Sequence, residues 1–529
     1  MNLKEKMQKS TNNKIIIKQL KKDIKGITLI ALVVTIIILL ILAGVAINLT
    51  VGDNGLFKRA QNAVDTWQLA EQNEQSEMNK TTEFLEDYIA SNTNFTTANG
   101  KIHVIWLDTN NNVIESPNSP ADYLGGMTPV YWSGEADNYE EHEDTEITEN
   151  FGNIWYNYTG IDGTEENLTS KWANAKDENG SYFVWIPRFA YRITFFIDEN
   201  SDIPTGYYDG RGLLNASEEP VLININGTDT AIGLDEGIET VKYNGDSYIV
   251  HPAFIDDSTN GYSNGGWDDD LAGIWVSKYE MSRIDATINE YGKSEQIRSV
   301  PSVKALGLTI REMYTKAYEY SRDNDSHLIK NSEWGAVAYL SYSQYGRNGH
   351  EIDINNSDTY ITGNGGGATN ASPSNGITNE YNTILGQHAS TTGNITGVYD
   401  MSGGLGEAVA AFNNIDDNNY EETFGGTFAG VNNTSTKYYT RYSNATENNS
   451  GIEIYLIGKV GDATKEVYSG NASSSWNNDN AVYLYKNEPF ISRGGGYSHK
   501  TGAGVFCCNS YIGSSDGYYS GIRVVLAGV

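Results

Sequence analysis

The strongest hydrophobic pattern in the chain is an apolar run near its start. The run Ile27–Ile47 is 21 residues long and contains only Thr28 and Thr35 as polar side chains. A helix rises about 1.5 Å per residue, so the run is roughly 30 Å long, enough to cross the apolar core of a bilayer. The pattern therefore predicts a transmembrane helix over residues 27–49. A cleaved export signal ending at the small residues 44–46 remains an alternative.

After the Gly-Asp-Asn-Gly sequence at 52–55, apolar positions recur at helical spacing to about residue 90. This periodicity predicts an amphipathic stalk helix over residues 50–92. Its apolar stripe would pack on the globular part or on another copy of the chain, and the spacing leaves both open. The stripe consists of Ala60, Ala63, Val64, Trp67, Ala70, Met78, Phe84, Leu85, Tyr88 and Ile89.

Residues 93–164 have a weaker pattern and are interpreted as a small, strand-rich linker region. Within it, "KIHVIWLD" (101–108) alternates apolar and polar positions as a strand does. The acidic stretch 135–149 is most simply an exposed loop.

From residue 165 to 529 the pattern changes to short strands separated by Gly- and Asn-rich turns. The strongest strand candidates are "SYFVWIPRFAYRITFFI" (181–197) and "AGIWVSKYEMS" (272–282). Two helices are clear, at 309–322 and 331–346, the second with Asn331 or Ser332 as its N-cap. Residues 354–382 are interpreted as a long surface loop. Two helices among many strands predict an α+β domain.

Charge sets the orientation of this arrangement. Before Gly26 there are eight lysines against Glu5 and Asp23, a net charge of +6. Such an excess favours a cytoplasmic N-terminus, which places everything after Asn48 outside the membrane. The whole chain carries −32, so residues 27–529 carry −38. A chain this acidic repels nucleic acid, so a nucleic-acid partner is not expected.

The junction Lys25-Gly26-Ile27 resembles the processing site of the prepilin family. In that family a basic leader (here residues 1–26) ends in Gly and is cut immediately before the apolar helix. The resemblance implies cleavage by a prepilin peptidase between Gly26 and Ile27. Pilins usually carry Glu at the fifth mature position, where this chain has Ala31. This departure puts assembly with pilus subunits in question but leaves processing intact.

Several motifs between about 165 and 529 occur in the order found in the formylglycine-generating-enzyme and sulfatase-modifying-factor superfamily. That superfamily has a variant of the C-type lectin fold, so the resemblance implies a C-type lectin-like domain over 165–529. The "YDMSGGLGEAV" segment lacks the tryptophans that the superfamily usually has there. The motifs are "IWVSKYEMS", "NSEWGAVAYL", "YDMSGGLGEAV" (399–409), "SRGGGYS" (492–498) and "GIRVVL" (521–526).

Enzymatic activity is not expected to accompany the resemblance. The copper-binding cysteine pair of formylglycine-generating enzymes would fall on His499 and Gly504. Adjacent cysteines bridge only with strain, so Cys507 and Cys508, the only two in the chain, are not expected to form a disulfide. The seven histidines also show no paired ligand spacing for an iron site. A metal-dependent oxidase remains the alternative enzyme class.

The C-terminal segment 493–526 more closely resembles the variable region of proteins diversified by retroelements. There, constant framework residues hold varied residues on an exposed, ligand-binding face. Tyr, Ser, Asp, His and Cys are the residue types that adenine-directed mutagenesis produces, and Tyr-rich surfaces suit recognition. The candidate ligand-binding residues are Tyr497, His499, Lys500, Cys507, Cys508, Ser510, Tyr511, Ser515, Asp516, Tyr518 and Tyr519.

Two further residue patterns are informative. Arg523 lies inside the apolar strand "GIRVVL", where a charge must be paired or hydrogen-bonded. Acidic residues around 256–270 would suit a structural calcium ion, although they match no spaced calcium loop. We expect no other cofactor. The candidate calcium ligands are Asp256, Asp257, Asp268, Asp269 and Asp270.

The sequence thus predicts a single-pass protein of the bacterial cell membrane, with an extracellular domain that binds a protein or glycan ligand. The alternatives are an enzyme of the formylglycine-generating superfamily and a structural, pilin-like subunit.

Overall fold

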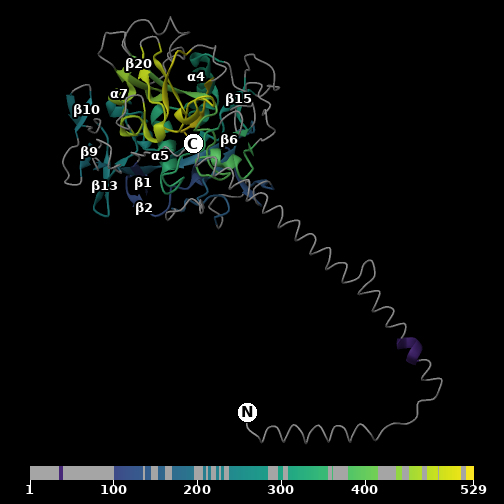
Figure 1. Ribbon diagram of the computed structural model, residues 1–529. Helices are drawn as coiled ribbons and strands as arrows, with labels where there is room; N and C mark the ends of the chain where they lie inside the picture. The colour runs from purple at the N-terminus through teal and green to yellow at the C-terminus, as the bar shows by residue number, and fades with distance from the viewer. Residues whose placement is uncertain are drawn as a thin grey trace, which may run out of the picture. The chain divides into compact units, whose positions relative to one another are not determined.

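The computed structural model divides into two units, Met1–Asn94 and Phe95–Val529. The helices and strands labelled in Figure 1 belong to the second unit. In the first unit only residues 35–39 are described, and they are helical. The described residues include no helix that is both long and apolar enough to span a bilayer. The predicted leader, the stalk and the rest of the predicted transmembrane helix lie outside the described residues. The described ranges are 35–39, 100–134, 138–144, 153–160, 170–195, 206–209, 212–215, 222–225, 228–231, 237–283, 296–301, 308–355, 360–361, 379–414, 436–443, 452–467, 474–485, 488–513 and 520–528.

The second unit is mostly β-structure, and two seven-stranded antiparallel sheets form its larger part. The first sheet has the order β12-β13-β7-β1-β2, with β8 and β9 attached to β7. Its strands are β1 (Gly100–Leu107), β2 (Val113–Ile114), β7 (Phe189–Phe195), β8 (Gly206–Asp209), β9 (Gly212–Asn215), β12 (Thr240–Tyr243) and β13 (Asp246–Val250).

The second sheet has the order β17-β27-β14-β6-β5-β3-β4 and brings the C-terminal strand next to the middle of the chain. Its centre is buried, with Trp185 paired directly opposite Trp275. Its strands are β3 (Thr128–Ser133), β4 (Glu140–Glu143), β5 (Asn174–Lys176), β6 (Tyr182–Pro187), β14 (Gly273–Ser277), β17 (His327–Leu328) and β27 (Val524–Leu526).

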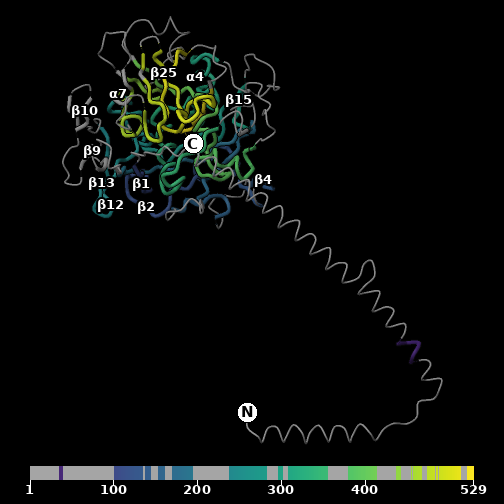
Figure 2. Tube along the Cα trace, viewed as in Figure 1, coloured from purple at the N-terminus to yellow at the C-terminus, as the bar shows by residue number. Residues whose placement is uncertain are grey.

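A third, five-stranded sheet carries the C-terminal segment of interest. Its order is β21-β20-β24-β25, with β26 pairing in parallel with β20. Figure 2 shows β25 close to α4, and the amide of Ile310 at the start of α4 donates to the Gly513 carbonyl at 3.1 Å. The strands are β20 (Gly406–Asn414), β21 (Thr440–Ser443), β24 (Phe490–Arg493), β25 (Cys508–Tyr511) and β26 (Ser520–Gly521).

The remaining described strands form two-stranded pairs, of which β18-β19 is parallel. They are β10 (Leu222–Ile225) with β11 (Thr228–Ala231), β15 (Met281–Arg283) with β16 (Ile297–Ser299), β18 (Tyr360–Ile361) with β19 (Asn379–Glu380), and β22 (Ile452–Glu453) with β23 (Tyr483–Leu484).

Both helices predicted for residues 165–529 are present, as α4 (Ile310–Glu319) and α5 (Asn331–Tyr342). The short helix α7 (Ile454–Ile457) was not predicted. The α4 helix begins with a capping box between Thr309 and Glu312. All twelve residues of α5 are buried, as its apolar composition on every side requires. Neither predicted N-cap of α5, Asn331 or Ser332, is correct: the cap is Lys330, whose backbone N–H donates to the Glu333 carboxylate at 2.8 Å.

Three strand-level expectations need correction. The 181–197 run is two strands in different sheets, because β6 ends at Pro187 and the chain crosses at Arg188 from the second sheet to the first. The expected exposed acidic loop contains β4, whose glutamates lie on an edge strand paired with β3. The 93–164 region is not a separate linker. Its strand β1 pairs with β7 over seven residues and lies in the same compact unit.

Candidate ligand-binding face

The C-terminal face centres on the turn that follows β24. Tyr497 is partly exposed, and His499 and Lys500 are exposed. The Tyr497 amide donates to the Gly404 carbonyl at 2.7 Å, which fixes the turn to the segment before β20. The Gly496 amide donates to His499 Nδ1 at 3.1 Å. Lys500 has a φ of 54°, an unusual value for a residue with a side chain, so this exposed turn stores backbone strain.

Two glycines allow the turn to lie close to the buried framework. A Cβ on Gly495, whose φ is 70°, would come within 2.8 Å of the Ala503 backbone. A Cβ on Gly504 would lie 2.1 Å from both carboxylate oxygens of Asp479. Asp479 is fully buried, and its Oδ2 accepts the Phe506 amide at 2.9 Å. Burial raises the pKa of the Asp479 carboxyl well above its ordinary value.

The strand β25 carries Ser510 and Tyr511, which are both partly exposed. The Ser510 hydroxyl donates to Glu488 Oε2 at 2.6 Å, and the Tyr511 ring packs against the hydrophobic core. Among the described members of the predicted set, His499 and Lys500 are thus the exposed ones, and Tyr497, Ser510 and Tyr511 are partly exposed. Four other predicted residues lie outside the described residues: Ser515, Asp516, Tyr518 and Tyr519.

The prediction that Cys507 and Cys508 contact a ligand does not agree with their position. Both thiols are buried, at 0% and 1% exposure, and both are free. Burial raises the pKa of both, to about 11 for Cys508, which disfavours the reactive thiolate. They belong to the framework, because Cys507 directly precedes β25 and Cys508 is its first residue, and their amides donate to the carbonyls of Gly504 and Asn480. Residue type alone did not reveal this position.

Arg523 is paired, as predicted from its apolar neighbours, although it lies between β26 and β27 rather than inside one strand. It is fully buried, and its Nε and one Nη donate to Glu407 Oε1 at 2.9 and 2.7 Å. Its other Nη donates to the carbonyls of Ser277 and Lys278 at 3.0 and 3.2 Å. The guanidinium therefore joins β27 to β20 and to the end of β14.

Two more buried carboxyl groups lie near this pair: Glu280 interacts with Arg523 and Glu407, and Asp400 interacts with Glu280 and Glu407. Burial, followed by the charges of Asp400 and Glu407, raises the pKa of Glu280 well above its usual range. Burial also raises the pKa of Glu407 to about 7, although Arg523 opposes this shift. Glu280 Oε1 accepts the Leu405 amide at 2.7 Å. Leu405 is next to Gly404, whose carbonyl accepts the Tyr497 amide. The Glu280 carboxyl group therefore helps to hold the segment to which the Tyr497 turn is bonded.

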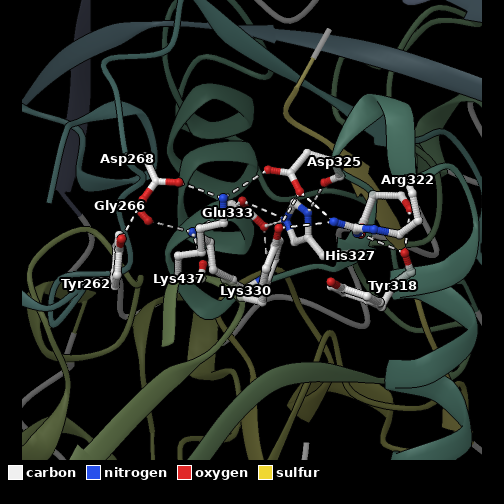
Figure 3. Close-up of polar contacts among 12 residues, drawn as sticks. Tyr262, Gly266, Asp268, Tyr318, Arg322, Asp325, His327, Lys330, Glu333 and Lys437 are labelled. Atoms are coloured by element: carbon white, nitrogen blue, oxygen red, sulfur yellow. Dashed lines mark hydrogen bonds and ion pairs between the residues drawn. The ribbon is translucent and has the colours of Figure 1, made fainter. Parts of the chain in front are cut away.

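A second buried charged network lies at the start of α5 and was not predicted from the sequence (Figure 3). Lys330 Nζ lies 3.6 Å from the centre of the Trp267 ring and donates to the carbonyls of Gly266 and Lys437, each at 3.0 Å. It is 3.8 Å from Glu333. Burial lowers the pKa of Lys330 to about 8. The only hint in the sequence was the charged pattern around the helix start.

In the same network His327 has an acceptor at each ring nitrogen. Nδ1 is 2.9 Å from the Asp325 carbonyl, and Nε2 is 3.0 Å from both oxygens of Glu333. A neutral imidazole has one N–H, so two acceptors require a doubly protonated ring or a protonated Glu333. Burial opposes ionisation of Glu333, but the charges of His327 and Lys330 outweigh it and keep the Glu333 pKa below its usual value. His327 and Glu333 therefore form a close, fully buried pair at the start of α5.

This network continues outward to the surface. Lys437 bridges Asp268 at 2.7 Å and Asp325 at 3.4 Å, and Arg322 pairs with Asp325 at 3.0 Å. Figure 3 shows these side chains in a row from Tyr262 to Arg322. The cations and anions of this row are paired with one another. These ion pairs hold the loop before β14 and the segment before β21 close to the start of α5. Its evident role is structural.

The carboxylates proposed for calcium are engaged by protein donors. Asp257 is buried and accepts the Asn264 amide at 2.7 Å, while Asp270 pairs with Arg188 at 2.9 Å. Asp256 accepts the Ser258 amide at 2.9 Å, Asp268 binds Lys437, and Asp269 is exposed. Within the described ranges, no three His, Cys, Asp or Glu residues gather as metal ligands would. The calcium hypothesis gains no support here.

Comparison with known proteins adds no family to these observations. No protein-family model matches the chain, and no curated protein matches it significantly.

Proposed function

We propose that this chain is a binding protein displayed on a bacterial cell surface, in which the Tyr497–Lys500 turn and β25 form part of a ligand-binding face on a C-type lectin-like domain. The observation that carries the proposal is the contrast between the turn and its base. Exposed His499 and Lys500 lie in a strained turn, and buried charges and close-packed glycines hold that turn from below. A rigid base beneath adaptable polar and aromatic side chains suits recognition.

The ligand is an extracellular protein or glycan, and the chain is attached to the membrane through residues 27–49. The strongly acidic composition argues against nucleic acid as a partner. The order of motifs and the Tyr- and Ser-rich C-terminal segment support the lectin-like interpretation and its diversification by a retroelement. An enzyme or a pilin-like subunit gains no specific observation in its favour.

The binding face is tested by single substitutions in the full-length protein, purified in detergent. A glycan array and a panel of bacterial surface proteins would first identify a ligand. Tyr497→Ala, His499→Ala and Lys500→Ala should each weaken binding, with about 2 kcal/mol lost at a central contact. The melting temperature should change little, because exposed substitutions usually stay within about 0.5 kcal/mol.

Tyr243→Ala is the matched control, because Tyr243 is an exposed tyrosine on β12. It should leave binding unchanged. If the three turn variants bind every identified ligand as tightly as the wild type does, the proposed face is wrong.

The proposed membrane attachment makes a separate prediction about the N-terminus of the mature chain. If the prepilin-like junction is processed, the mature chain begins at Ile27. Intact mass and N-terminal sequencing of membrane-extracted protein would check this. A mature N-terminus near Asn48 would instead identify signal-peptidase cleavage.

A further inference from the structure

Two buried side chains outside the proposed face are in direct contact across the second sheet. Lys278 Nζ is 2.8 Å from Asn174 Oδ1, and neither residue is exposed. Asn174 begins β5, and Lys278 directly follows β14. The strand β6 lies between them, with its Val184 paired to both Asn174 and Val276. The contact therefore spans three neighbouring strands and joins segments about a hundred residues apart.

The surroundings of Lys278 are aromatic. Its Nζ lies 4.9 Å from the centre of the Trp132 ring, and 5.2 and 5.8 Å from those of Tyr399 and Tyr279. No carboxylate among the described residues forms an ion pair with it. The carbonyls of Ile395 and Gly397 are its other acceptors. Three acceptors position the Lys278 nitrogen, and burial lowers the pKa of Lys278 well below its ordinary value.

The amide of Asn174 is held in one orientation. Its Nδ2 donates to the carbonyls of Trp172 and Thr396, at 2.9 and 2.8 Å. Since both of these partners can only accept, the oxygen of the amide must be the atom that faces Lys278. The carbonyl carbon, Cγ, is bonded to that oxygen. The fold buries both groups completely and holds the lysine nitrogen one bond away from contact with Cγ, in a water-poor setting.

We propose that Lys278 and Asn174 form an intramolecular amide cross-link between the second sheet's strands β5 and β14. The lone pair of the neutral Nζ attacks Cγ, and the Cγ–Nδ2 bond then breaks. Nδ2 takes up one hydrogen from the attacking amine and leaves as ammonia. One N–C bond forms and one breaks, so no oxidant or reductant is needed. The chain loses about 17 Da, the mass of ammonia, in this modification.

Such a bond would fasten the sheet covalently in a protein whose two cysteines are free. It would close the chain between Asn174 and Lys278 in the same way as a disulfide does, which limits the freedom of the unfolded chain. The cross-link is independent of whether the C-terminal face binds a ligand.

Peptide mapping of the denatured full-length protein tests the proposal. Trypsin does not cut after an amidated lysine, so the product should join peptide 172–176 to peptide 243–283, with Lys278 uncut. Its mass should be about 17 Da below the sum of the two peptides. Lys330 is the internal control, because it is also fully buried but contacts no asparagine amide oxygen in the hydrogen bonds described for it. Cleavage after Lys330 should be complete.

Two variants separate the partners. Lys278→Met should release free peptide 172–176, and Asn174→Ala should restore cleavage after residue 278. If these variants fail to fold, the wild-type digest still decides the question. Full recovery of free peptides 172–176 and 243–278 from wild-type protein, in the same yield as peptide 323–330, would overturn the cross-link and leave a hydrogen-bonded buried lysine.

Discussion

A chain that begins at residue 165 should lose cooperative unfolding, whereas one that begins at residue 95 should keep it. The first truncation removes β1, β2, β3 and β4 from the two large sheets. The loss of β1 is the most damaging because both of its faces are buried. Ile102, Val104 and Trp106 belong to the main core, and Ile105 and Leu107 belong to a smaller core cluster.

The expected size of this effect is large. Removing a single buried tryptophan side chain costs about 3–5 kcal/mol, and whole domains are stable by only about 5–15 kcal/mol. The truncation deletes both Trp106 and Trp155 and leaves one side of β7 without its partner. Thermal melts followed by circular dichroism and calorimetry would check the two chains. If the shorter chain melts cooperatively at the same temperature, residues 100–160 are an appendage to the core.

The boundary at 165 could not have been placed correctly from local patterns. The alternation of 101–108 predicted a strand, and β1 confirms it. The partner of that strand is β7, and the paired residues His103 and Arg192 are 89 positions apart in the sequence. Periodicity reports which side chains of a strand are apolar, but a strand buried on both faces is recognised only when its partners are known.

The candidate site shows the same division between local and long-range information. Arg523 required a partner because a charge in an apolar strand must be compensated, and the sequence could predict that much. It could not identify Glu407, which pairs with Arg523 across 116 residues. The cysteines of the C-terminal segment were assigned to the face by residue type. Their burial depends on how the turn after β24 packs. That packing requires glycine at 495 and 504, which lie close to Ala503 and Asp479.

Replacing Arg523 with methionine should destabilise the protein strongly, and more at pH 8 than at pH 5. Methionine fills much of the volume but leaves Glu407 without its cation. Breaking a buried ion pair in this way costs about 3–5 kcal/mol when the remaining charge stays ionised. Glu407 has a pKa of about 7 in the folded protein, against an ordinary value of 4.5. Because Arg523 lowers that pKa, the variant should raise it further.

The direction of the pH dependence follows from proton binding. A carboxyl group with a raised pKa binds protons more tightly in the folded state than in the unfolded state, so stability falls as pH rises from about 4.5 to 7. At pH 5 the Glu407 of the variant is mostly protonated, and little charge is left buried. At pH 8 the variant bears the full cost of burying the carboxylate or of keeping it protonated.

Urea unfolding of Arg523→Met and of the wild type at pH 5 and pH 8 would measure the difference. The double variant Arg523→Met/Glu407→Gln is the matched control, because it removes both charges and should recover much of the loss at pH 8. A destabilisation by Arg523→Met that is equal at both pH values, or that the second substitution does not relieve, would contradict the assignment. The arginine would then act through its hydrogen bonds to the carbonyls of Ser277 and Lys278 rather than by neutralising Glu407.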